Sequence, residues 1–296
     1  MNNIKDDTTM ELQYIFDYAI RDKEGKPYGE GYTIAKSESV YDRYMSNDGW
    51  NRYLTEMSEE HRKQYDEVGQ GGELKEGRYP PKMACYGSSS RIIYTILQDI
   101  DGIKFECPLL TKVGSRPANL DAYRRANNTE IFVEAKCREI YVQHKMVKAS
   151  RTYCKVYEYI RDKYIGFSFY TEEITDKEGN VNESDYNYSF FHSNKPIIRF
   201  DIKQLISHFL GIVAGVLNGR VKNEIRFVYF IYNPTELNNK KLSDIYSKTI
   251  EEVNIINISE LFKAVFEYQK KNLKVEKDLP KFEFVLADQN NIKSKL

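Results

Sequence analysis

The sequence is poor in cysteine and has no pattern typical of a zinc site or of disulfide bonds. Its four cysteines, Cys85, Cys107, Cys137 and Cys154, are at least 17 residues apart, and none belongs to a CxxC pair. We therefore expect neither a zinc site nor a disulfide framework, but the reduced thiols of an intracellular protein.

Long apolar runs are also missing. The longest covers the nine residues 209–217, about half of the ~20 that a membrane-spanning helix needs. The first residues contain two acidic side chains before any apolar stretch, so they do not resemble a secretion signal. We expect a cytoplasmic protein without membrane contact.

The chain has no formal net charge, because 44 Lys and Arg residues are balanced by 44 Asp and Glu residues. An even spread of these charges would argue against a polyanionic partner. The spread is uneven: residues 1–80 hold 11 basic and 17 acidic side chains, a balance of −6, whereas residues 111–163 hold 12 and 6, a balance of +6. Such a basic run is either a solvated face or a polyanion-binding face.

Hydrophobic periodicity predicts an α/β protein in which a mixed sheet is flanked by helices. Strands are expected at residues 103–107, 118–123, 130–136, 225–232 and 282–286. Helices are expected at residues 89–100, 138–163 and 256–271, and from the N-cap Asp201 to Gly219. Residues 124–128 read as a five-residue turn, and residues 171–194 as an inserted loop or hairpin.

The expected domain organisation is one core with additions at both ends. Residues 1–80 are an acidic N-terminal region that packs on or extends the core, although its elements are hard to predict. Residues 81–235 form the core, with an insertion around residues 165–195. Residues 236–296 add a helix and a strand to the same domain.

A carboxylate and an ammonium group lie side by side on the strand predicted for residues 130–136. Side chains alternate along a strand, so Glu134 and Lys136 project to the same face. Asp121 precedes them on the neighbouring strand and faces the same way if the pairing register brings it near Glu134. Two converging carboxylates repel each other unless a cation lies between them, and hard oxygen ligands suit Mg²⁺.

The Glu134-Ala135-Lys136 triplet carries little weight by itself. Random placement of the acidic and lysine residues predicts about four (D/E)xK triplets, and the sequence contains four. Only this one follows an apolar, β-branched run and has an aspartate on the preceding strand. The alternative interpretation is an ordinary Glu/Lys pair at the edge of a strand.

Leu120-Asp121-Ala122-Tyr123, followed by Phe132-Val133-Glu134-Ala135-Lys136, resembles the split motif of the PD-(D/E)xK nuclease superfamily. That superfamily includes many restriction endonucleases, and short blocks at residues 71–74, 80–83 and 88–90 are similar to a restriction-endonuclease-like branch. The order of predicted elements from residue 88 to residue 232 is similar to its core of helix, three strands, helix and strand. The resemblance covers roughly half of the chain.

The resemblance implies a Mg²⁺-dependent hydrolase of DNA phosphodiesters, with Mn²⁺ as a possible substitute. Asp121, Glu134 and the carbonyl group of Ala135 would hold the metal ion, and Lys136 would orient the attacking water. The motif departs from its name at Leu120, where proline is expected.

Four further polar residues bear on the site. The helix at residues 89–100 lacks the glutamate that many family members direct at the metal, and Glu73 could replace it if the preceding glycine-rich loop folds over the site. Gln204 resembles the glutamine of a QxxxY helix in the RecB-like branch. His208, on the same face, is interpreted as a core histidine, and Glu106 as facing solvent.

In this context the basic run becomes a candidate DNA-binding surface. The residues expected to contact phosphates are Arg116, Arg124, Arg125, Arg138, Lys145 and Lys148. The leading interpretation is an endonuclease that cleaves duplex DNA in restriction or phage defence. A homodimer is a possible assembly. The alternatives are a recombination or repair nuclease acting on branched or single-stranded DNA, a catalytically silent DNA-binding module, and a protein without nucleic-acid contact.

Overall fold

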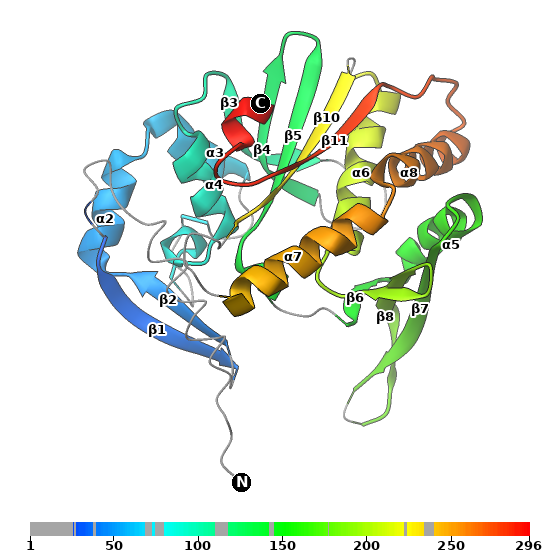
Figure 1. Ribbon diagram of the computed structural model, residues 1–296, viewed down its shortest axis with the longest axis horizontal. Helices are drawn as coiled ribbons and strands as arrows, with labels where there is room; N and C mark the ends of the chain where they lie inside the picture. The colour runs from blue at the N-terminus through cyan, green and yellow to red at the C-terminus, as the bar shows by residue number, and fades with distance from the viewer. Residues whose placement is uncertain are drawn as a thin grey trace.

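A mixed sheet of five strands lies at the centre of the molecule (Figure 1). In the order β11-β10-β5-β4-β3, the pairs β3/β4 and β4/β5 are antiparallel, whereas β5/β10 and β10/β11 are parallel. The strands are β3 (Ile103–Leu109), β4 (Ala118–Ala126), β5 (Thr129–Lys136), β10 (Glu224–Ile231) and β11 (Phe282–Ala287). The α/β class with a mixed sheet, predicted from the sequence, is confirmed.

The structure is a computed structural model, and it describes residues 26, 28–37, 40–68, 73–74, 80–109, 118–141, 145–176, 178–221, 224–233 and 240–296. Within these ranges, no helix is both long enough and apolar enough to cross a membrane.

Helices cover both faces of the central sheet. Figure 1 shows α3 (Glu59–Val68) and α4 (Ser89–Leu97) on one side, and α6 (Ile202–Leu217) and α8 (Ile258–Leu273) on the other. Because both faces are covered, almost every residue of β5 and β10 is buried.

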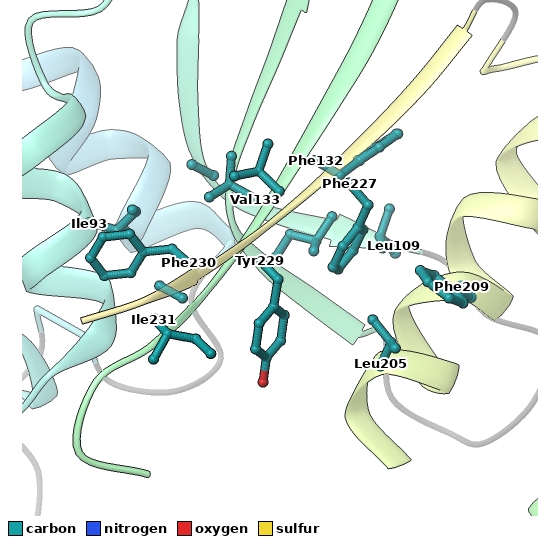
Figure 2. Packing of buried hydrophobic residues seen from close by; sticks show 14 of the residues in the cluster. Ile93, Leu109, Phe132, Val133, Leu205, Phe209, Phe227, Tyr229, Phe230 and Ile231 are labelled. Atoms are coloured by element: carbon teal, nitrogen blue, oxygen red, sulfur yellow. The ribbon is translucent and has the colours of Figure 1, made fainter. Parts of the chain in front are cut away.

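Apolar side chains fill the space between the sheet and these helices (Figure 2). On one side Ile93 of α4 and Phe230 of β10 are both fully buried in this cluster. On the other side Phe209 of α6 meets Phe227 edge to face, with ring centroids 5.4 Å apart. The sheet is therefore held rigidly between two helical layers.

Helices α4 and α6 each begin at a side-chain cap, and the cap of α6, Asp201, was predicted. The Ser88 hydroxyl accepts the N–H of Arg91 and starts α4, and the Asp201 carboxylate accepts the N–H of Gln204 and starts α6. Helix α6 ends as predicted before Gly219, which adopts φ +79°. Helix α4 ends at Leu97, three residues earlier than predicted.

The N-terminal region, whose elements the sequence did not define, packs against β3 and α4. Its elements are β1 (Glu30–Ser37), β2 (Val40–Met45), α2 (Asn47–Glu56), α3 and the short η1 (Lys82–Ala84). Tyr65 of α3 stacks on Phe105 of β3, and Gln64 Oε1 accepts the N–H of Phe105 at 2.8 Å. Helix α3 thus covers part of an edge strand that would otherwise expose unpaired backbone groups.

A second, antiparallel sheet lies beside the core. It has the order β6-β8-β7, with β9 paired to β8. Its strands are β6 (Val147–Ser150), β7 (Phe167–Thr175), β8 (Val181–His192) and β9 (Lys195–Ile197). The hairpin predicted within residues 171–194 is confirmed, and it begins earlier, at Phe167.

Two local predictions were wrong. Residues 138–163 are not one helix but comprise η2 (Arg138–Tyr141), strand β6, η3 (Arg151–Tyr153) and α5 (Cys154–Lys163). Pairing of β6 with the edge of β8 outweighs the helical periodicity there. The five-residue turn is also wrong, because β4 continues to Ala126 and leaves only Asn127 and Asn128 in the turn.

The C-terminal region adds α7 (Lys240–Ile255), α8, β11 and η5 (Ile292–Lys295). Helix α8 and strand β11 were predicted, whereas α7 was missed. Buried side chains from Tyr28 to Ile292 belong to one hydrophobic cluster. The division of the chain at residues 80 and 235 stays a prediction.

Candidate functional site

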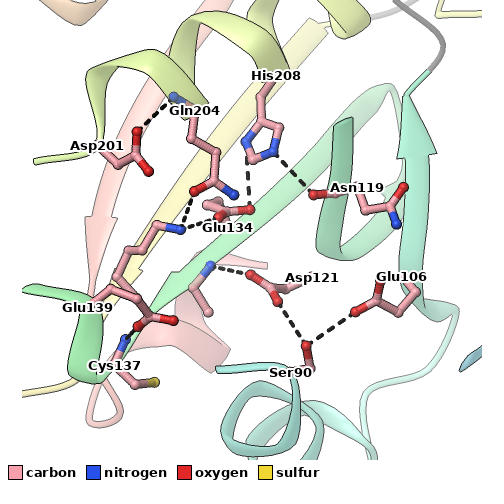
Figure 3. A network of polar contacts seen from close by, with 12 residues as sticks. Ser90, Glu106, Asn119, Asp121, Glu134, Cys137, Glu139, Asp201, Gln204 and His208 are labelled. Carbon is pink, nitrogen blue, oxygen red and sulfur yellow. Dashed lines mark hydrogen bonds and ion pairs between the residues drawn. The ribbon is translucent and has the colours of Figure 1, made fainter. Parts of the chain in front are cut away.

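The two acidic residues of the split motif lie at the same end of the β4/β5 pair. The last paired residues there are Ala122 and Val133, and Asp121 and Glu134 are the next residue on each strand. Asp121 Oδ2 accepts the N–H of Ala135 at 2.7 Å, so the carboxylate is tied to the neighbouring strand (Figure 3). Burial, together with the charge of Glu134, raises the pKa of Asp121 well above its ordinary value.

Lys136 joins β5 to α6. Its Nζ donates to Glu134 Oε1 at 2.7 Å and to Gln204 Oε1 at 2.5 Å, and all of these groups except Gln204 are buried (Figure 3). Burial alone would lower the pKa of Lys136, but the charge of Glu134 and other acids outweighs it, so the pKa lies above its ordinary value. Lys136 is therefore a protonated donor fixed in direction by two acceptors.

His208 lies on the other side of Glu134, one helical turn after Gln204. Its Nε2 lies 3.1 Å from the carbonyl oxygen of Asn119, which can only accept, so Nε2 carries the hydrogen. Its Nδ1 lies 3.6 Å from Glu134 Oε2 and has no hydrogen-bond partner among the described residues. Burial and the charge of Lys136 lower the pKa of His208 to about 3, so the ring is neutral. The interpretation as a core histidine holds for one ring nitrogen only.

Glu106 belongs to the same cluster, and the interpretation that it faces solvent was wrong. It is only 5% exposed and stands across the β3/β4 ladder from Asp121. The Ser90 hydroxyl of α4 lies 3.2 Å from Glu106 Oε1 and 3.4 Å from Asp121 Oδ1 (Figure 3). Burial, followed by the charges of Asp121 and Glu73, raises the pKa of Glu106 to about 8.

No pattern in the sequence indicated Glu106. Strand alternation places it on the outward face, with the exposed Lys104 and Pro108. Its backbone adopts φ +49°, a left-handed conformation that is rare for a residue with a Cβ and is concentrated at functional sites. This backbone conformation turns the side chain toward Asp121. It depends on the folded structure and corresponds to no pattern in the sequence.

Glu73, predicted to reach the site from an upstream loop, is buried. Its Oε1 accepts from Lys82 Nζ at 2.9 Å, and its Oε2 has no hydrogen-bond partner in the described part of the chain. Its charge contributes to the raised pKa of Glu106. The preceding loop residues 69–72 lie outside the described residues.

The donor set fits a magnesium ion that keeps most of its water. In the described ranges no three side chains of the types His, Cys, Asp and Glu come close enough together to hold a metal ion. The predicted ligands are instead two carboxylates, of Asp121 and Glu134, and the main-chain carbonyl of Ala135. Mg²⁺ is commonly bound through only one or two carboxylates. Burial and the charges of neighbouring acids both disfavour the ionised carboxylates. A divalent cation would offset this electrostatic cost.

The residues predicted to bind DNA lie in several different settings. Arg124 donates to the carbonyl oxygens of Asp101 and Leu296, and Arg125 Nε lies 3.9 Å from Glu130. Lys148 is exposed and pairs with Asp185 at 3.2 Å, and Lys145 is exposed. Arg116 lies outside the described residues, and so does the side chain of Arg138 in η2. Part of the positive charge of residues 111–163 is thus balanced within the protein.

Comparisons of the chain with protein-family models, with curated proteins and with solved structures found no significant match. The residues and geometry described above therefore carry the functional argument.

Proposed function

We propose that the protein is a Mg²⁺-dependent DNA endonuclease of the PD-(D/E)xK type. The observation that supports this best is the grouping of Asp121, Glu134 and Lys136 at one end of the β4/β5 pair, with both carboxylates buried. A Glu/Lys pair at a solvated strand edge would not be buried in the middle strand of a sheet. Burial of three ionisable groups is costly unless it serves a site.

The arrangement of elements is consistent with this proposal. Helix α4 is followed by the antiparallel strands β3, β4 and β5, then by α6 and the parallel strand β10. This is the order of the superfamily core that the motif resembles. Restriction or phage defence, and duplex DNA as the substrate, are part of the proposal and rest on that resemblance.

The proposed roles follow from the contacts of each residue. Asp121, Glu134 and the carbonyl of Ala135 would hold Mg²⁺, and the bound ion would supply Lewis-acid polarisation of a phosphate and a lowered pKa for a water. Lys136 is protonated, so it donates hydrogen bonds to phosphate oxygens or to the attacking water and offsets developing negative charge. Gln204 Oε1 holds Nζ in position, and Ser90 orients the carboxylate of Asp121.

The test is cleavage of supercoiled plasmid DNA by the wild type and by the near-isosteric variants Asp121→Asn and Lys136→Met. We expect nicked or linear products with Mg²⁺ or Mn²⁺, none with chelator, and a loss of at least about a hundredfold in either variant. Cleavage that survives both substitutions would contradict the assignment of the site.

A panel of substrates separates the alternatives. Preference for forks or single strands over duplex DNA would indicate a recombination or repair nuclease. DNA binding that weakens with salt and persists in chelator, with no products under any divalent ion, would indicate a silent binding module. If the protein shows no salt-sensitive binding to DNA, it does not act on nucleic acids.

A further inference from the structure

An acidic residue of the C-terminal region is bonded to the segment that leads into the site. Glu252 of α7 lies more than one hundred residues after β5 in the sequence, and α7 packs beside η2. Its Oε2 accepts three consecutive backbone N–H groups, of Ile198 at 3.2 Å, Arg199 at 2.8 Å and Phe200 at 3.0 Å. One carboxylate oxygen thus fixes the direction of a whole loop.

The bonded loop controls the start of α6. Residue 201 follows it directly, and the Asp201 carboxylate caps α6 by accepting the N–H of Gln204 at 2.9 Å. Gln204 in turn accepts from Lys136 Nζ. Glu252 therefore fixes the loop that ends at the cap Asp201. This cap fixes the first turn of α6, which carries Gln204 against the lysine.

The same loop is also bonded to the segment that follows β5, the strand that carries Lys136. Arg199 NH1 donates to the carbonyl oxygen of Ile140 at 3.1 Å, in the η2 segment that follows β5. Lys136 lies four residues before Ile140 at the end of β5. The end of β5 and the start of α6 are consequently tied to one loop, and that loop is tied to Glu252.

We propose that Glu252 is a positioning residue that keeps Gln204 against Lys136, with Arg199 as its link to β5. The catalytic part of this inference rests on the proposed nuclease function, whereas the structural part does not. A role limited to fold stability would lower the melting temperature without a specific effect on Lys136.

Labelling of Lys136 tests the structural part in the absence of any activity. Wild type and the variants Glu252→Ala, Glu252→Gln and Gln204→Ala are treated with a reductive methylation reagent, and modification is read by mass spectrometry. The exposed neighbour Glu251 provides the matched control, Glu251→Gln. The thiol of Cys137 is fully buried beside Lys136, so its alkylation by iodoacetamide, followed in a parallel reaction, reports local unfolding of β5.

We expect Glu252→Ala and Gln204→Ala to raise the labelling rate of Lys136 about tenfold without labelling of Cys137, since each removes hydrogen bonds that involve a charged group. Glu252→Gln keeps an acceptor oxygen and should lie between these variants and the wild type. Unchanged labelling of Lys136, or labelling of Cys137 in parallel with it, would overturn the inference.

A double-mutant cycle on single-turnover cleavage tests the catalytic part. Because Glu252 acts through Gln204, Glu252→Ala should slow cleavage about tenfold in the wild-type background and by less than about twofold in Gln204→Ala, with unchanged DNA affinity. Additive losses would overturn the positioning role. If the wild type does not cleave DNA at all, the proposed function fails and the labelling result still decides the role of Glu252.

Discussion

The ammonium group of Lys136 lies 2.7 Å from Glu134 Oε1, on the carboxylate proposed to bind Mg²⁺. Lysine and metal ion therefore compete for the negative charge of one residue. Two unit charges about 4 Å apart interact with an energy of about 4 kcal/mol at an effective dielectric constant of 20, so this competition is substantial.

Lys136→Met should consequently bind divalent metal more tightly while losing cleavage. We expect the affinity for Mn²⁺, measured by calorimetry, to rise at least about tenfold. The exposed Lys148 supplies the control variant Lys148→Met, which should bind metal as the wild type does. Weaker metal binding in Lys136→Met would show that the lysine supports the site in another way.

Glu106→Gln should stabilise the protein at alkaline pH when a chelator is present. Burial and the neighbouring acids raise the pKa of Glu106 to about 8, from 4.5 in an unperturbed chain. Between these values the folded state holds a proton that the unfolded state has lost, so stability falls by about 1.4 kcal/mol per pH unit as pH rises.

Melting curves from pH 5 to pH 8 measure this effect. The wild type should lose stability relative to Glu106→Gln as pH rises, and the two should converge toward pH 5. Parallel curves across the range would mean that Glu106 is not held in the buried cluster. The exposed Glu178→Gln should follow the wild type throughout.

Gly211→Ala should destabilise the contact between α6 and the edge strand β3. A Cβ at this position would lie 2.4 Å from the Cβ of Leu109, closer than two carbon atoms can approach. We expect a loss of about 1–3 kcal/mol in the free energy of unfolding, measured by denaturant titration. Leu109→Gly in the same chain removes this Cβ and should recover part of the loss, and fully additive losses would argue against this contact.

Arg124→Gln should leave DNA affinity and its salt dependence unchanged, because the side chain already donates to two carbonyl groups. Lys145→Gln, which removes an exposed charge, should lower the slope of log affinity against log salt by about 0.9. Fluorescence anisotropy at several salt concentrations distinguishes the two. A lower slope in Arg124→Gln would restore it as a phosphate contact.

Local patterns predicted the central elements of this fold because those elements depend on local signals. The caps Ser88 and Asp201 start α4 and α6, and the apolar alternation of residues 130–136 places Glu134 and Lys136 on one face. The direction of Asp121 was left open by the sequence, since it depends on the pairing register, and the two-residue turn that fixes this register is shorter than the predicted one.

The remaining features depend on tertiary contacts. Strand β6 exists because residues 147–150 meet the edge of β8, more than thirty residues later. Glu106 reaches the site through a left-handed backbone conformation, and Glu252 reaches it through a loop of another region. Propensity and spacing carry no information about these contacts, so the candidate site was predicted at its motif and not in its surroundings.

The most direct test of the central claim compares two buried glutamates on the same strand. Glu134 and Glu130 share one face of β5, and both are 3% exposed, but Glu130 contacts Tyr123 and Arg125 rather than the candidate site. Single-turnover cleavage of duplex DNA with Mg²⁺ should fall at least about a hundredfold in Glu134→Gln and stay within about threefold of the wild type in Glu130→Gln. Equal losses in the two variants, or full activity in Glu134→Gln, would contradict the account.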